Sequence, residues 1–145
     1  MKASSGLKFL NLWFNDKLLV ADLDSCLDYI FQLDQIKILD LRWRRLSAGN
    51  IISSLNKQGK EKRISSLCLS EAHRPFSGFD ILEISSFLPE LQEWTGDSQS
   101  FGITVEMARE WKRICPKLEI VELLGLSDEV EVVLQDMGVD VYEKG

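Results

Sequence analysis

The sequence of 145 residues has few of the residues on which common catalytic and metal sites depend. It contains a single histidine, His73, and three cysteines, Cys26, Cys68 and Cys115, with no CxxC pair. This scarcity argues against a zinc site, a disulfide framework and most histidine-based catalysis. Neither GxGxxG nor GxxxxGK[ST] occurs, so no motif supports nucleotide binding. We therefore expect a protein that is not an enzyme and that uses no cofactor or metal.

Long apolar runs are also absent, and the uncharged stretches are far too short to span a membrane. The N-terminal segment has neither the apolar region nor the small-residue cleavage site of a signal peptide. Unpaired cysteines favour a reducing compartment, so we expect a cytoplasmic or nuclear protein. A composition of 45% hydrophobic and 28% charged residues is typical of a globular chain, and 145 residues suffice for one domain.

Charge is distributed unevenly along the chain. Residues 1–63 contain 11 Lys or Arg and 7 Asp or Glu, whereas residues 64–145 contain 6 and 16. This difference in net charge between the two parts of the chain could orient a partner, or it could reflect two solvated faces. The basic run from Lys57 to Arg63 has no interleaved aromatic residues, so it is typical of a solvated turn, and we expect no nucleic-acid partner.

An internal repeat dominates the sequence. Five hexads share an LxxLxL pattern with aliphatic, aromatic or Gly substitutions, and their starts lie 29, 28, 27 and 27 residues apart. The hexads are Leu7–Leu12, Ile36–Leu41, Ile64–Leu69, Leu91–Gly96 and Leu118–Leu123. Apolar residues at helical spacing fill each interval between them, for example Leu23, Leu27 and Ile30 in the first. The pattern predicts alternating strands and helices, closed by a short strand over 139–142.

This pattern resembles the leucine-rich repeat family over nearly the whole chain, about residues 6–142, because the period lies in the family's range. The stretch Cys115-Pro-Lys-Leu118 is similar to the cysteine-containing repeats of F-box proteins in ubiquitin ligases. The Asn that usually follows the hexad occurs once, as Asn15. The resemblance implies an α/β leucine-rich repeat solenoid of about five strand–helix repeats of 27–29 residues, with a parallel sheet on the concave face. Residues 1–145 would form one such domain, with repeats starting near residues 7, 36, 64, 91 and 118.

Strand geometry predicts which side chains face a ligand. If the hexad leucines point into the core, the residues between them point outward onto the concave face. Aromatic residues and Arg dominate interface energetics, so Trp13, Arg42 and Trp43 are the expected anchors. Acidic residues on the later strands would suit a basic segment of a partner, or form a solvated face. The expected protein-binding residues are Phe9, Asn11, Trp13, Phe14, Asp40, Arg42, Trp43, Ser70, Glu71, Glu93, Asp97 and Glu122.

Other interpretations of these residues remain open. Trp13 and Phe14 could be covered by a further repeat or cap. A catalytic role for His73 would need partners such as Ser70 and Asp97, and nothing in the sequence fixes that geometry. We expect Trp94 and Trp111 in the core.

The family resemblance implies a non-catalytic protein-interaction module that recognises substrates in an F-box-type ubiquitin ligase. The hexads begin at Leu7, which leaves no room for an F-box, so contact with ligase components would need a missing segment or a larger assembly. The alternative is a structural subunit that packs against a partner or a second copy of itself through the N-terminal edge of the solenoid, since end repeats need polar caps.

Overall fold

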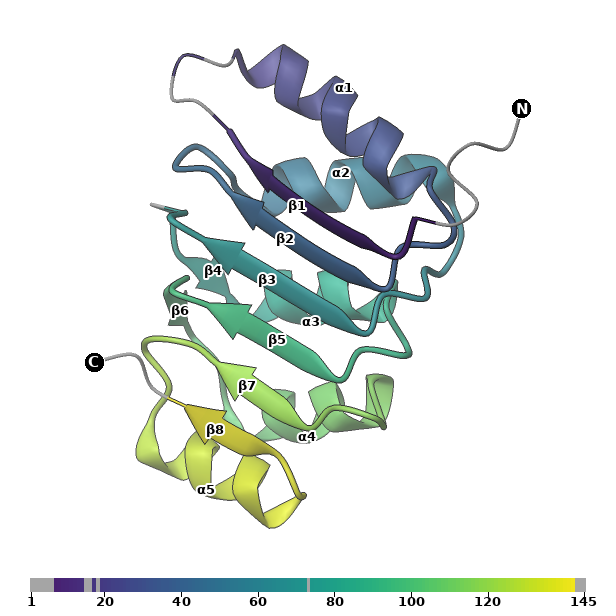
Figure 1. Cartoon of the computed structure of the whole chain (residues 1–145). Helices are drawn as coiled ribbons and strands as arrows, with labels where there is room; N and C mark the ends of the chain where they lie inside the picture. Colours follow the sequence, from purple (N-terminus) through teal and green to yellow (C-terminus); the bar gives the residue numbers. More distant parts are fainter. Residues whose placement is uncertain (1–6, 15–16, 18, 73, 143–145) are drawn as a thin grey trace.

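The fold is α/β, with strands and helices that alternate along the chain, as the sequence predicts (Figure 1). The computed structural model describes residues 7–14, 17, 19–72 and 74–142. In these ranges the helices are α1 (Val20–Phe31), α2 (Ala48–Gln58), α3 (Gly78–Ser86), α4 (Val105–Ile114) and α5 (Asp128–Asp136). The strands are β1 (Phe9–Trp13), β2 (Ile38–Arg42), β3 (Ser66–Ser70), β4 (Phe76–Ser77), β5 (Glu93–Gly96), β6 (Ser100–Phe101), β7 (Ile120–Glu122) and β8 (Asp140–Tyr142).

A parallel sheet of six strands, in the order β1-β2-β3-β5-β7-β8, forms one layer of the described part of the molecule. Its register aligns the same hexad position in successive strands: Leu10 lies beside Leu39, Leu39 beside Leu67, Leu67 beside Trp94, and Trp94 beside Val121. The hexads are therefore strands, and each neighbours the next. The short strand predicted over 139–142 is also present, as β8.

A repeated backbone contact aligns the loops that lead into the strands. The carbonyl oxygen of Lys8 accepts the N–H groups of both Lys37 and Ile38, at N···O distances of 2.8 and 3.0 Å. The carbonyls of Lys37, Ser65 and Gln92 each accept the corresponding two N–H groups of the next strand, at 2.7 to 3.0 Å. Lys37, Ser65 and Gln92 consequently follow one another along the edge where the strands begin.

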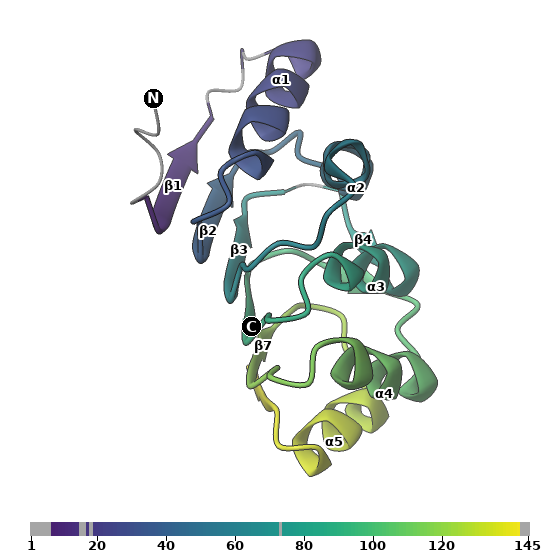
Figure 2. The same ribbon diagram turned by 90° about the vertical axis from the view of Figure 1, so that its right-hand side faces the viewer.

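The five helices of the described chain pack on one face of this sheet, and each contacts the next helix in sequence (Figure 2). The core lies between the two layers and contains the inward side chains of the strands, such as Leu39, Leu41, Leu67 and Leu69. In the described ranges no helix covers the opposite face, which we call the open face. None of these helices is both long and apolar enough to cross a membrane.

Aromatic residues fill the middle of the core. Trp94 and Trp111 are both buried, as predicted. Their rings are 5.8 Å apart in an edge-to-face arrangement, and Phe76 contacts Trp94 in the same way at 6.2 Å. These three residues belong to successive parts of the chain, so they join adjacent strand–helix units.

Hydroxyl side chains begin four of the helices. Ser47 and Ser77 form capping boxes with Asn50 and Asp80, which bind the first free N–H groups of α2 and α3. Thr104 and Ser127 cap α4 and α5 by accepting N–H groups three residues later. These polar residues therefore set where the helices start.

A second small sheet was not anticipated from the sequence. Strands β4 and β6 pair in parallel and lead into α3 and α4. At only two residues each they are too short to produce a recognisable alternation of polar and apolar residues.

Candidate protein-binding surface

The open face displays the outward side chains of the strands in rows. The first row contains Phe9, Ile38, Ser66, Glu93 and Ile120; the second contains Asn11, Asp40, Cys68 and Thr95; the third contains Trp13, Arg42 and Ser70. Their inward neighbours on β2, β3, β5 and β7 are buried, so the predicted alternation is correct.

Three of these side chains are exposed apolar residues on the first two strands, and the polar row of Asn11 and Asp40 lies between Trp13 and the other two. Trp13 is 75% exposed, Phe9 54% and Ile38 39%. Phe9 and Ile38 are register partners, so their side chains lie next to each other on the sheet. We call Phe9, Trp13 and Ile38 the apolar patch. The exposure predicted for the two aromatic residues is confirmed, whereas Ile38 was not among the expected contact residues, although its outward strand position marks it.

The expectation for Trp43 is wrong. This residue is fully buried, and its ring meets that of the partly buried Phe14 edge-to-face at 6.2 Å. Strand β2 ends at Arg42, and the Trp43 N–H still donates to the carbonyl of Ser70, the last residue of β3, at 3.2 Å. Leu39, Leu41 and Trp43 are all buried, so the alternation continues one residue past β2 and turns Trp43 inward. Placing both Arg42 and Trp43 outward was inconsistent with it. Trp43 therefore belongs to the core, and Phe14 is largely its neighbour rather than a contact residue.

A charged pair borders the apolar patch. The Arg42 guanidinium lies 3.7 Å from the carboxylate of Asp40, whose side chain is only 15% exposed. The Oδ1 atom of Asp40 is buried and has no hydrogen-bond partner. Arg42 is 44% exposed, so it remains accessible to a ligand beside Trp13.

The acidic residues of the later strands have more local roles than expected. Glu93 accepts a hydrogen bond from Ser66 at 3.3 Å. Asp97 accepts the backbone N–H of Glu71 at 2.7 Å and so holds Glu71 in its left-handed conformation, with φ of 66°. Glu122 is half-buried on β7. Asp97 thus supports a loop in addition to carrying charge.

The thiols do not form a reactive site. Cys26, Cys68 and Cys115 are free, and burial raises the pKa of each, that of Cys115 to about 12. A raised pKa keeps a thiol protonated and poorly nucleophilic at neutral pH. Within the described ranges no group of three or more His, Cys, Asp or Glu could hold a metal ion. His73 and Asn15 lie outside the described residues.

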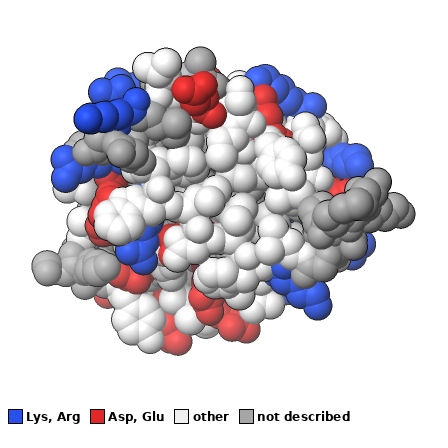
Figure 3. All heavy atoms as spheres, turned by 45° about the horizontal axis from the view of Figure 1, so that its top comes forward, with Lys and Arg blue, Asp and Glu red and all other residues white. Residues whose placement is uncertain are grey.

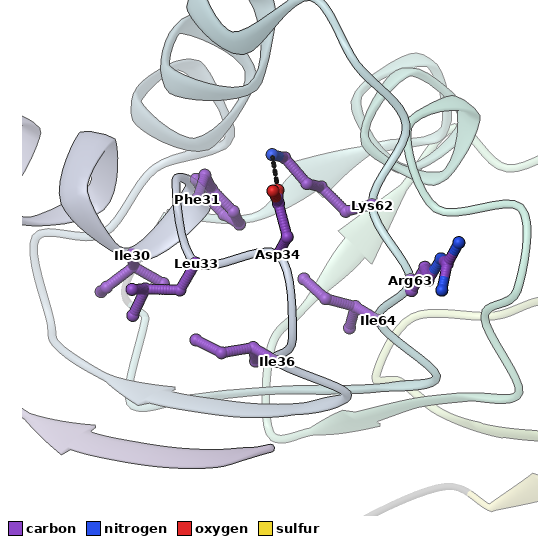
Figure 4. Close-up of a pocket in the computed structure, with 8 residues that line it drawn as sticks. All are labelled: Ile30, Phe31, Leu33, Asp34, Ile36, Lys62, Arg63 and Ile64. Carbon is purple, nitrogen blue, oxygen red and sulfur yellow. Dashed lines mark ion pairs between the residues drawn. The ribbon is translucent and has the colours of Figure 1, made fainter. Parts of the chain in front are cut away.

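One buried cation was not identified in the sequence. Lys62 is 5% exposed, and its ammonium lies 3.5 Å from the exposed carboxylate of Asp34 (Figure 4). Its backbone N–H donates to the carbonyl of Phe87 at 2.7 Å. The adjoining cavity, lined by apolar residues such as Phe31 and Ile64, measures about 10 Å³, roughly the space of one water. Lys62 therefore joins neighbouring units and does not create a ligand site.

The N-terminal end of the sheet exposes residues that are core elsewhere. Leu7 is 39% exposed, whereas the first residues of the next two hexads, Ile36 and Ile64, are buried. Leu10 and Leu12 on the edge strand β1 are only partly buried. Figure 3 looks toward this end and the open face, and uncharged side chains occupy the middle of the view while charged ones lie mainly around it.

No family model matches the sequence, and no curated protein matches it. Function must therefore be inferred from the surface itself.

Proposed function

We propose that this protein is a non-catalytic leucine-rich repeat module that binds a protein ligand on the open face of its sheet. The apolar patch carries the proposal, because exposed aromatic and aliphatic side chains on adjacent strands are characteristic of contact sites. Trp13 and Phe9 supply apolar area, Ile38 extends it, and Arg42 offers a directed charge at its border.

The repeat assignment is supported by the regular spacing of the strands. Register partners on β1, β2, β3, β5 and β7 are separated by the same 29, 28, 27 and 27 residues as the hexads. Each unit adds one strand and one helix, as in a solenoid whose inner, concave face carries the sheet. Such a face accommodates an extended peptide or one side of a globular partner.

The decisive experiment maps partners by cross-linking and mass spectrometry. Wild type is compared with the double variant Trp13→Ala/Ile38→Ala and with Phe79→Ala as control. Phe79 is 74% exposed but lies on α3, in the helix layer. We expect the double variant to remain folded by circular dichroism and to lose cross-links to the open face at least tenfold, while the control retains them. Unchanged cross-links in the double variant would contradict the proposal.

We further propose that the ligand is a substrate presented to a ubiquitin ligase in the cytosol or nucleus. The cysteine-containing repeat junction supports this context, since Cys115 is buried with its thiol 3.3 Å from the carbonyl of Leu88 and 3.6 Å from that of Ser85. Ligase components would be reached through a further segment or a larger assembly. Partners that bind the patch should show less ubiquitination in cells expressing Trp13→Ala/Ile38→Ala; equal ubiquitination would refute the ligase context alone.

A second candidate is a structural subunit that assembles through its N-terminal end, with a partner or with a second copy of the chain. The exposure of Leu7 and the partial burial of Leu10 and Leu12 favour it. Light scattering, which measures the mass of the particle in solution, would distinguish the two candidates. If the protein assembles through its N-terminal end, Leu7→Ser/Tyr29→Ser should reduce this mass, whereas Trp13→Ala/Ile38→Ala should not. Leu7 precedes β1, and Tyr29 is an exposed residue of α1.

A further inference from the structure

A polar hollow lies at the edge where the strands of the large sheet begin. Its volume is about 460 Å³, within the usual range of ligand sites. The lining residues are Lys37, Arg63, Ser65, Glu90, Gln92 and Lys117. They come from the segments that precede β2, β3, β5 and β7. Lys37 directly precedes Ile38 of the apolar patch, whereas Trp13 lies at the other end of β1.

The backbone holds these segments in place. The carbonyl of Lys37 accepts the N–H groups of Ser65 and Ser66, and the carbonyl of Ser65 accepts those of Gln92 and Glu93. The hydroxyl of Ser65 also donates to the Lys37 carbonyl at 3.2 Å. The floor of the hollow is therefore part of the sheet rather than a set of independent loops.

The hollow is cationic although the whole protein has a net charge of −6. Lys37, Arg63 and Lys117 face a single carboxylate, that of Glu90, which pairs with Lys117 at 3.6 Å. Within the described ranges neither Lys37 nor Arg63 makes an ion pair. Lys37 and Arg63 are thus available to a ligand, and Lys117 can exchange its exposed partner Glu90 for one. Arg63 provides the forked donor geometry that suits phosphate.

The spacing of the cations indicates the size of the ligand. Lys37 and Lys117 precede β2 and β7, which are three steps apart in the sheet, about 14 Å at the usual strand spacing of about 4.8 Å. This span is longer than one phosphate group, so it suits a ligand that carries more than one. None of the lining residues is aromatic, so the hollow offers no surface on which nucleic-acid bases would stack.

We propose that this hollow binds a ligand bearing two or more phosphate groups. Arg63 and Lys37 pair with one group, Lys117 with another, and the amide of Gln92 donates a hydrogen bond between them. The ligand is either a small oligophosphate or a peptide with neighbouring phosphorylated residues, since both offer the same chemistry.

Isothermal titration calorimetry with sodium tripolyphosphate tests the proposal directly. We expect saturable binding with one site per chain that weakens at least tenfold in Lys37→Gln/Arg63→Gln. The control Arg45→Gln/Arg109→Gln removes two exposed charges away from the hollow and should change the dissociation constant less than twofold. Absence of saturable binding, or equal weakening in both variants, would overturn the proposal.

A second experiment asks which kind of molecule carries the phosphates and whether negative charge without phosphate is enough for binding. A peptide with two adjacent phosphoserines is compared with the same peptide carrying aspartates. Tighter binding of the phosphopeptide than of tripolyphosphate assigns a phosphorylated protein, and the reverse assigns a small oligophosphate. If the aspartate peptide binds as tightly as the phosphopeptide, phosphate recognition is refuted. Trp13→Ala should leave every one of these affinities unchanged.

Discussion

Gly96 lies where two neighbouring strands approach too closely for a side chain. It takes the last position of its hexad, where all four other hexads have leucine, with φ of 128°. A Cβ atom added there would be 2.0 Å from the carbonyl oxygen of Leu69 on β3. The irregular hexad therefore reflects a backbone requirement rather than loss of the repeat.

We expect Gly96→Ala to lower the free energy of unfolding by about 2–4 kcal/mol, because it adds a backbone clash to an unfavourable φ. Gly59→Ala is the matched control: φ is 63°, but the added Cβ meets nothing within 4 Å. Its cost should be about 1 kcal/mol. Urea denaturation measures both values, and equal losses would argue against the clash.

The buried thiol of Cys115 makes stability depend on alkaline pH. Burial raises its pKa from 9.0 to about 12 in the folded protein, so the folded state favours the neutral thiol. The stability that the folded state gains from keeping this thiol neutral is fully present below pH 9, and it is lost as the pH rises from about 9 toward 12. Between pH 8 and 10 we expect wild type to lose up to about 1.4 kcal/mol more stability than Cys115→Ala. If urea denaturation shows that wild type and Cys115→Ala lose the same stability between pH 8 and 10, the buried thiol is not the cause.

Residues at the ends of strands were the hardest to predict from sequence. Alternation correctly placed Phe9, Trp13 and Trp94, because they lie within strands. The prediction for Trp43 was wrong because it placed two consecutive residues, Arg42 and Trp43, on the outer face, whereas the alternation continues one residue past β2 and turns Trp43 inward. Lys62 was also missed, since polarity suggests exposure whereas its aliphatic stem can pack in the interior.

At the scale of elements, polar contacts join the first two helices. Asp28 of α1 accepts hydrogen bonds from Ser54 at 2.6 Å and Lys57 at 3.0 Å, and these contacts lower its pKa. Asn50, which completes the cap of α2, also donates to Asp24 at 3.1 Å. The start of α2 is therefore fixed both by its own cap and by its neighbour.

Removing this cap should destabilise the protein measurably. We expect Ser47→Ala to reduce the free energy of unfolding by about 1 kcal/mol, because the capping box with Asn50 is lost. Ser53→Ala changes an exposed serine inside the same helix and should have an effect within about 0.5 kcal/mol. A loss from Ser53→Ala as large as that from Ser47→Ala would show that the cap is not responsible.

The hexads were sufficient to predict the elements of the large sheet because each strand alternates clearly between core and open face. The pair β4 and β6 could not be found in this way. Their pairing depends on the N–H of Phe76 reaching the carbonyl of Gln99 at 2.8 Å, a contact between distant residues. The apolar patch was predicted in part, since Phe9 and Trp13 were among the expected contact residues but Ile38 was not.

At the scale of the whole molecule, the elements form a series in which each contacts mainly its neighbours. Strand β2 pairs with β1 and β3, and helices α1 to α5 pack in chain order. Stability in such an array depends on interfaces between adjacent units. The central units have two such interfaces and the described end strands have one.

Hydrogen exchange should follow this arrangement. We expect backbone amides of β3 and β5 to exchange at least tenfold more slowly than those of β1, where one edge has no neighbouring strand in the described chain. Mass spectrometry of peptides spanning each strand measures the rates. Equal protection of β1 and β3 would indicate that the edge is covered in solution.

The order of the strands also determines how the protein would respond to mechanical force. Because β1 and β8 lie at opposite edges of the sheet, tension applied between them acts across the strands, along the hydrogen bonds. The bonds of one interface then break in succession rather than all at once. Stretching would thus peel off one strand–helix unit after another at low force, and the chain would lengthen in steps of about 27 residues.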